Sequence, residues 1–233
     1  MRRVIRTLFL VAIVGWSLAP FLWQWITSLK PPGQVSQLPP VWPVTFSLDH
    51  YRSVLGNPDF LRVIANSLVV SLGATGLSLG VGSIGAFGIV HLVRGRAPWI
   101  LLGLLVIFMI PPVAVVTPFF KVMTRLHLKD TWLGLILVYS VFIIPLVVWI
   151  MHQVYEEIPR SLYHAARVDG CGNWTIFWRV YLPLSRGGLV SAGLLGILFC
   201  WNEFLFALTF TTTYASRTIP VGISLFTGQF VFP

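Results

Sequence analysis

The sequence predicts an all-α membrane protein, a polytopic helical bundle that forms a single transmembrane domain over residues 1–233. Hydrophobic residues make up 56% of the chain and charged residues only 10%, whereas a soluble domain carries about 25% charged residues. Five long stretches contain at most one formal charge each. A chain of this length leaves much of its surface in contact with solvent, so the composition excludes an ordinary soluble globular protein. A disordered chain is also excluded, because it would be polar and highly charged.

Each apolar stretch is long enough to cross the hydrocarbon core, which takes about 20 residues of helix. We expect α-helices because backbone groups in lipid must be satisfied within the span. The five expected spans lie near residues 4–29, 63–90, 97–123, 131–154 and 187–213. The first is longer than the apolar core of a secretory signal peptide and is expected to stay uncleaved.

The basic residues predict the orientation in the membrane. Arg2, Arg3 and Arg6 precede the first span, and such a cluster favours a cytoplasmic N-terminus. Residues 31–62 then form a periplasmic loop and residues 155–186 a cytoplasmic loop. The formal net charge of +9 does not indicate nucleic-acid binding, because the basic residues form no dense patch.

Glycine and proline mark two of the spans. Gly76-x-x-x-Gly80 in the second span permits close approach of another helix; simple packing is favoured over a position on the permeation path. The third span contains Pro111, Pro112 and Pro118, which remove backbone hydrogen bonds and bend a helix. That bend serves either packing or a hinge near the substrate path.

Glu203 is the only acid inside an expected span. An ionisable group in the membrane is a functional candidate by default, and three alternatives stay open for it. The carboxylate lines the path, forms a hydrogen bond to another helix, or lies near the outer interface. With Trp201 and Asn202 it forms the candidate set of path residues.

The segment before the fifth span predicts two short helices joined by a turn. The first runs from Arg160 to about Val168, and Asp169-Gly170 ends it because glycine accepts the left-handed cap conformation. The second is amphipathic, with Trp174 and Phe177 among its aromatic residues. The residues alone leave two alternatives, a helix that docks in the groove of a partner and a hairpin on the membrane surface.

Residues 164–170, His-Ala-Ala-Arg-Val-Asp-Gly, are followed after nine residues by Val-Tyr-Leu-Pro at 180–183. This pattern resembles the EAA motif of bacterial ABC-importer permeases, which is Glu-Ala-Ala, three residues, Gly, nine residues and Ile-x-Leu-Pro. Residues 49–52, 130–134 and 201–204 are similar to the maltose-type, carbohydrate-uptake branch. The resemblance covers essentially the whole chain.

The sequence departs from the family pattern in three ways. His164 stands where the family has glutamate, and Gly187-Gly188 replace a proline. The family has six spans, whereas five are visible here, so we expect a sixth helix beyond the C-terminal end of this sequence.

The resemblance implies a permease subunit of a binding-protein-dependent ABC importer in the bacterial inner membrane. It would form half of the path for a sugar or related polyol. Its partners would be a related second permease, two ATPase subunits and an extracytoplasmic substrate-binding protein. The implied ATPase-coupling residues are His164, Ala165, Ala166, Asp169, Gly170, Leu182 and Pro183.

The chain itself is expected to be no enzyme and to bind no cofactor or metal. It has no GxxxxGK[ST] phosphate loop, so ATP and Mg are expected in the ATPase partners. The alternative function is an ion-coupled secondary carrier or channel. Proton coupling usually requires a relay of buried ionisable groups, and Glu203 stands alone.

Overall fold

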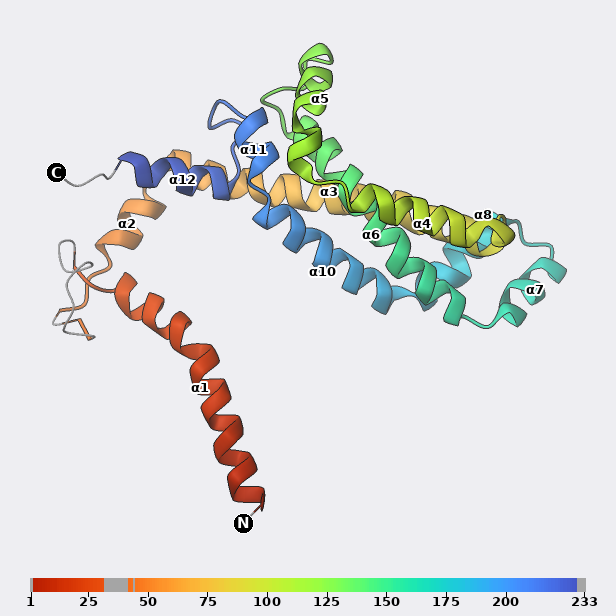
Figure 1. Ribbon diagram of the computed structural model, residues 1–233, viewed down its shortest axis with the longest axis horizontal. Coiled ribbons are helices and arrows are strands. Elements are labelled where there is room, and N and C mark those ends of the chain that lie inside the picture. Colours follow the sequence, from red (N-terminus) through yellow and green to blue (C-terminus); the bar gives the residue numbers. More distant parts are fainter. Residues whose placement is uncertain (1, 32–41, 44, 230–233) are drawn as a thin grey trace. The chain divides into compact units, whose positions relative to one another are not determined.

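The computed structural model describes residues 2–31, 42–43 and 45–229, and all regular structure in these ranges is helical (Figure 1). The expected all-α class is therefore confirmed. The chain divides into two units, residues 1–61 and 62–233, and each is described by itself. Three helices are long and apolar enough to cross a membrane, and two bent helix pairs bring the number to as many as five within the described residues.

The first unit holds α1 (Arg2–Ser28) and α2 (Asp49–Leu55). The apolar window of α1 is 0% buried, so its side chains need lipid or another protein chain. Two contacts join the end of α1 to the start of α2. The Ser47 amide donates to the Leu29 carbonyl at 2.9 Å, and the hydroxyls of Ser28 and Tyr51 are 2.7 Å apart.

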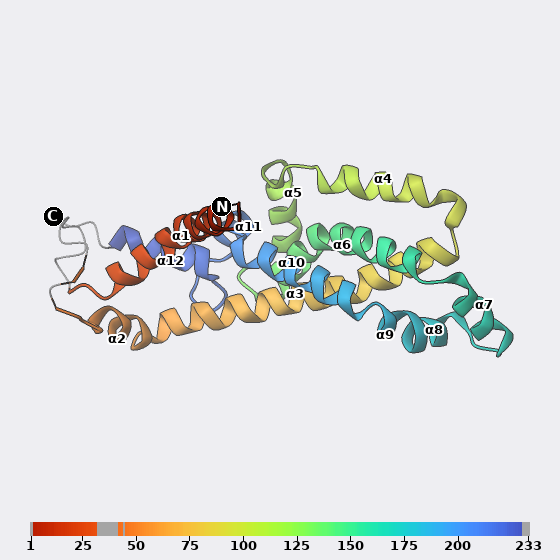
Figure 2. The ribbon, with the colours of Figure 1, turned by 90° about the horizontal axis from the view of Figure 1, so that it is seen from below.

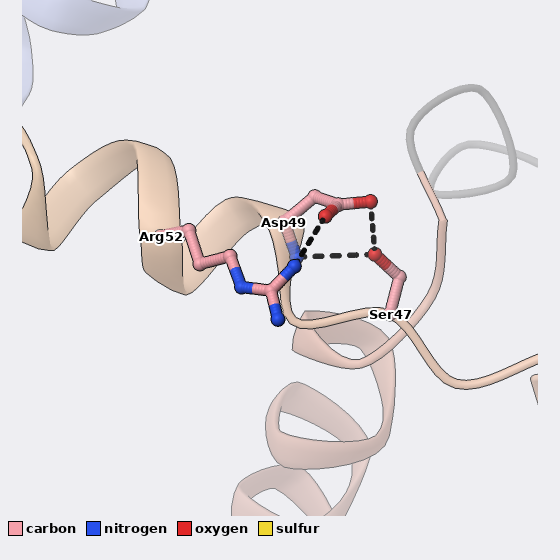
Figure 3. A network of polar contacts seen from close by, with 3 residues as sticks. All are labelled: Ser47, Asp49 and Arg52. Carbon is pink, nitrogen blue, oxygen red and sulfur yellow. Dashed lines mark hydrogen bonds and ion pairs between the residues drawn. The ribbon is translucent and has the colours of Figure 1, made fainter.

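A small polar network begins α2 (Figure 3). The Ser47 hydroxyl donates to the Asp49 carboxylate at 2.7 Å and accepts from the Asp49 amide at 3.1 Å. The Arg52 guanidinium lies 3.7 Å from the same carboxylate. An acid in the first turn is favourable to the helix dipole, while an exposed ion pair adds little. The network therefore defines where α2 starts rather than a ligand site.

The second unit is built around α6 (Trp132–Glu157), which packs against α10 (Arg186–Asn202). Helix α6 also contacts α3 (Pro58–His91), where the Ser140 hydroxyl donates to the Ala74 carbonyl at 3.3 Å. Glycines allow the close contacts. A Cβ atom on Gly82 would lie 2.6 Å from Val147, and one on Gly188 would lie 2.6 Å from Val154. A Cβ atom on Gly76 or Gly80 would meet nothing within 4 Å, so no other described part of this chain packs closely there. The expected approach of another helix stays a prediction.

The third expected span, residues 97–123, is not one continuous helix. A short turn (Arg94–Arg96) leads into α4 (Ala97–Phe108), and α5 (Pro112–Arg125) follows at an angle of 87°. Pro111 has an extended backbone and caps α5. Two successive prolines supply no amide donors to the helix before them, and proline disfavours a helical residue ahead of it. The expected kink is therefore a full break.

The fifth expected span, residues 187–213, is also interrupted. α10 ends at Asn202, Glu203 is extended, and α11 (Leu205–Phe210) follows. A further helix, α12 (Ile219–Gln229), begins after a polar loop. The sequence predicted one helix here because the composition stays apolar through the break.

Candidate functional site

The loop at residues 155–186, which contains the predicted ATPase-coupling residues and which we call the coupling loop, connects α6 to α10. Its first helix has the expected bounds. α6 ends at Glu157 because Ile158 and Pro159 have extended backbones. α7 (Arg160–Val168) follows. The Arg160 guanidinium lies 3.2 Å from the carboxylate of Glu156 across this joint. Figure 2 shows α7, α8 and α9 together at one end of the second unit.

The end of α7 is a Schellman turn with Gly170 in the left-handed conformation, at φ +80°. The Cys171 amide donates to the Ala166 carbonyl at 2.9 Å, and the Gly170 amide donates to the Arg167 carbonyl at 3.1 Å. These two bonds satisfy carbonyls that a helix end otherwise leaves open. An L-residue with a side chain rarely adopts this backbone conformation, which explains the glycine at this position.

The candidate coupling residues lie mostly on the outside of this turn. His164, Ala165, Asp169 and Gly170 are exposed, while Ala166 is half-buried. Val168 is also 87% exposed, which is unusual for a valine next to a packed core. The turn therefore presents polar side chains, including His164, Arg167 and Asp169, around one exposed apolar side chain, Val168.

The second part of the motif is at the base of the loop. α8 (Asn173–Ile176) continues as a π-helical turn (Phe177–Tyr181) and α9 (Leu182–Leu184). Pro183 cannot donate to the carbonyl four residues earlier and would clash with it, so the chain widens into the π-turn before it. Leu182 is half-buried and Pro183 is exposed. The segment then bends by 79° into α10.

The inner face of α7 meets an aromatic group that the sequence analysis missed. We call it the junction cluster; its members come from α3, α6, α7 and the π-turn and are Phe87, His91, Tyr155, Tyr163, Phe177 and Tyr181. The His91 and Tyr163 rings are stacked, with centroids 4.2 Å apart and planes 8° apart. The only sequence signal was the presence of aromatic residues near predicted helix ends.

The candidate path residues lie at the break between α10 and α11. The Glu203 carboxylate accepts from the amides of Phe206 at 2.9 Å and Ala207 at 3.2 Å. The acid thus caps the start of α11, where amide donors lack helical partners. The expectation that Glu203 lies inside a continuous spanning helix is wrong. The Asn202 side chain donates to the Leu198 carbonyl at 2.7 Å, and Trp201 is half-buried.

A second group that the sequence did not reveal surrounds Asp130, before α6. Its carboxylate accepts from the amide and hydroxyl groups of both Thr212 and Thr213 and, at 2.5 Å, from the Ser216 hydroxyl. Its own amide donates to the Phe210 carbonyl at 2.9 Å. Asp130 has φ +59°, a conformation that aspartate tolerates better than most residues.

These contacts decide the charge of Asp130. Burial alone would raise the pKa of the carboxyl group, but the hydrogen bonds from Ser216, Thr212 and Thr213 outweigh burial and hold the pKa well below its ordinary value of 3.8. Hydrogen bonds to the charged form favour that form. Asp130 is therefore a carboxylate at neutral pH, and it ties the α5–α6 loop to the α11–α12 loop.

Two side chains near the start of α3 form hydrogen bonds to the same α11–α12 loop. The Asn66 amide group donates to the carbonyls of Tyr214 and Arg217, both at 2.9 Å, and accepts from the Trp132 indole at 3.0 Å. The Ser67 hydroxyl accepts from the Ile219 amide at 2.7 Å. This loop is therefore held from two sides by buried or half-buried polar side chains.

Comparison with known proteins gives the class. The family described as "Binding-protein-dependent transport system inner membrane component" matches residues 76–227. The match spans more than half of the chain, so the protein belongs to this family. It is a membrane permease component of a binding-protein-dependent transport system.

Relatives and a solved structure agree with this class. The chain is 36% identical over 220 residues to the trehalose transport system permease protein SugB of Mycobacterium tuberculosis. That alignment covers 94% of this chain and 80% of SugB. The chain is also 32% identical over 225 residues to the trehalose/maltose transport system permease protein MalG of Thermococcus litoralis, covering 94% of this chain and 78% of that one.

The crystal structure of a bacterial ABC transporter involved in the import of the acidic polysaccharide alginate contains a chain of the same fold. The TM-score is 0.79 at 24% identity, and the alignment covers 96% of this chain and 78% of that one. This likeness confirms the all-α importer-permease fold predicted from the sequence.

Proposed function

We propose that this chain is one of two related permease subunits of an ATP-driven importer for a carbohydrate or a related polyol. It forms half of the translocation path, within one permease domain over residues 1–233. The substrate class is supported by the relatives, because the two named above are permeases for trehalose or maltose. An extracytoplasmic binding protein delivers the substrate, in keeping with the family description.

The exposed turn at the end of α7 is the observation that carries the proposal. Its exposed surface combines small or apolar residues, Ala165, Val168 and Gly170, with the polar side chains of His164, Arg167 and Asp169. All of them are open to a partner. A helix of this kind fits a groove, and the EAA-like pattern assigns that groove to an ATPase subunit. Closure of the two ATPase subunits then moves α7 and the spans attached to it.

Chemistry on ATP belongs to the partners. The chain has no phosphate loop, and within the described residues no three His, Cys, Asp or Glu side chains gather where they could hold a metal ion. ATP and Mg bind in the two ATPase subunits. The permease contributes the path and the contact that links the path to hydrolysis.

The orientation follows from the basic N-terminus. With residues 1–6 in the cytoplasm of a bacterial cell, the loop at 155–186 faces the ATPases and the loop at 31–62 faces the periplasm. Trp201, Asn202 and Glu203 lie at a helix break, where side chains and open backbone groups can face a path. The Glu203 carboxylate keeps its capping bonds in this arrangement.

Transport by the purified complex tests the proposal. The tagged chain is isolated with the subunits that copurify, placed in liposomes, and supplied with radiolabelled trehalose or maltose and an extracytoplasmic binding protein for that sugar. We expect uptake only when ATP and the binding protein are both present, and no effect of a proton ionophore. Uptake driven by an ion gradient without ATP would establish the carrier alternative instead.

A further inference from the structure

We propose that His91, at the end of α3, is a positioning residue that passes movement of the α7 coupling helix to the α3 span. The inference rests on the proposed function, because it assigns the step between ATPase docking and movement of the path. It concerns the inner face of α7, whereas His164 and Ala165 of the EAA-like motif are exposed on the outer face.

The stacking geometry makes His91 the link. Its ring lies parallel to that of Tyr163 at 4.2 Å and meets the edge of Tyr181 at 4.8 Å, with an interplanar angle of 81°. One turn earlier on α3, the Phe87 ring lies 4.7 Å from the His91 ring. The last turn of α3 thus touches both halves of the coupling loop through one imidazole.

Tyr163 is held at two points. Its ring stacks on His91, and its hydroxyl donates to the Asn173 side chain at 2.9 Å. Tyr163 directly precedes the exposed His164 and shares a helix face with half-buried Ala166, since residues three apart on a helix are neighbours. The inner face of α7 is therefore fixed to the spans while the outer face stays open for docking.

The rest of the junction cluster forms a rigid base. Tyr155 and Tyr181 are each 1% exposed or less, and Phe87 and Phe177 are nearly buried. Phe87 contacts Tyr181 at 5.2 Å and Phe177 at 5.5 Å in edge-to-face arrangements. Rings packed this way interlock, so tilting α7 moves the ends of α3 and α6 as well.

The first test measures the link without any transport assay. A nitroxide is attached at Ser161→Cys on α7 in the full chain in lipid nanodiscs, with Cys171 and Cys200 replaced by alanine. We expect a motionally restricted spectrum, a more mobile one for His91→Ala, and a restricted one again for His91→Phe, which keeps the stack. Leu92→Ala, which removes a neighbouring side chain that is 62% exposed, is the matched control and should leave the spectrum unchanged.

The second test measures coupling in the whole complex. For His91→Ala we expect at least about a fivefold rise in ATP hydrolysed per sugar imported, the lower end of usual coupling effects. The amount of copurified ATPase should not change, and His91→Phe should restore the ratio. A merely structural role would lower the yield of complex and both activities together, leaving the ratio as it is.

The outcomes separate the two proposals. If the unmodified complex shows no ATP-dependent uptake, the proposed function fails, and the nitroxide measurement still decides the role of His91. If uptake is normal but His91→Ala neither mobilises the nitroxide nor changes the ratio, the role assigned to His91 is wrong. The same conclusion follows if His91→Phe behaves like His91→Ala.

Discussion

The two ends of α3 are held by different chemistry. Asn66 and Ser67, near its start, form hydrogen bonds to the α11–α12 loop, and Asp130 accepts five more from that loop. His91, 25 residues later, makes ring contacts with α7 and the π-turn. At a rise of 1.5 Å per residue the two ends are about 37 Å apart.

This difference bears on which end can move. Hydrogen bonds to a carboxylate are strong and depend on geometry, so the Asp130 end has essentially one arrangement. Ring contacts have no fixed donor–acceptor geometry, and aromatic pairs in proteins pack at centroid distances of about 4.5 to 7 Å, so the His91 end can shift together with α7 while it stays packed. The Asp130 end therefore serves as a fixed frame and the His91 end as the joint to α7.

Removing Asp130 should have the largest effect on stability. Asp130→Ala leaves two threonine amides and three hydroxyls without their common acceptor. Each hydrogen bond to a charged group contributes about 1.5–3 kcal/mol, and partial exposure with replacement by water reduces the total. We expect a loss of about 2–3 kcal/mol, measured by thermal unfolding in detergent. The control is Glu157→Gln, which changes an exposed acid at the end of α6 beside the coupling loop. An equal loss of stability in that variant would contradict the special role of Asp130 in holding its end of α3.

Gly170→Val should lower the free energy of unfolding less than Asp130→Ala does, but it should reduce coupled uptake more. The left-handed backbone imposes about 1–2 kcal/mol on a residue with a Cβ, although space is open around this position. The chain should still insert, while the altered turn tilts α7 and uncouples ATP hydrolysis from uptake. The measurement is uptake at equal protein level, and unchanged uptake would contradict a docking role for the turn.

Substitutions at His164 and Ala165 test whether docking depends on a charge at the surface or on its shape. An exposed ion pair contributes about 0–1 kcal/mol, so His164→Glu should preserve ATPase copurification and uptake. Ala165→Asp should reduce both, because it places a charge in a packed contact. Loss of assembly in His164→Glu would show that the histidine makes a specific contact of its own.

The pH dependence should be the smallest effect near neutrality. The folded-state pKa of Asp130 lies below its ordinary value of 3.8, so its contribution to stability is complete above that value and is lost as the pH falls through the folded-state pKa. The difference in unfolding temperature between the unmodified protein and Asp130→Asn should be equal at pH 7 and pH 5 and shrink below pH 3.8. A difference that already shrinks between pH 7 and pH 5 would contradict the lowered pKa.

Local sequence signals predicted the local features well. Charge-free stretches located α1, α3 and α6, and the proline before Arg160 with the glycine at 170 predicted the bounds of α7. The double proline predicted a bend at residues 110–112 but not its size, because neighbouring helices decide how far a broken helix turns. Glu203 was misjudged, since an apolar stretch does not show where backbone amides lack partners.

The two end groups of α3 could not be predicted, because they join residues far apart in the chain. Asp130 and Thr212 are separated by 82 positions, and His91 and Tyr163 by 72. No periodicity or spacing encodes such pairs. They exist only once α3, α6 and α10 have packed, which places polar loops at one end and aromatic side chains at the other.

Photo-crosslinking from α7 tests the central claim most directly. A benzophenone amino acid replaces Val168, which is 87% exposed, and in a control it replaces Trp16, which is 85% exposed on α1. After illumination of intact cells, our account predicts a covalent adduct between Val168 and an ATPase subunit and none from Trp16. Adducts of Val168 with lipid alone would place α7 on the membrane surface and contradict its role as the coupling helix.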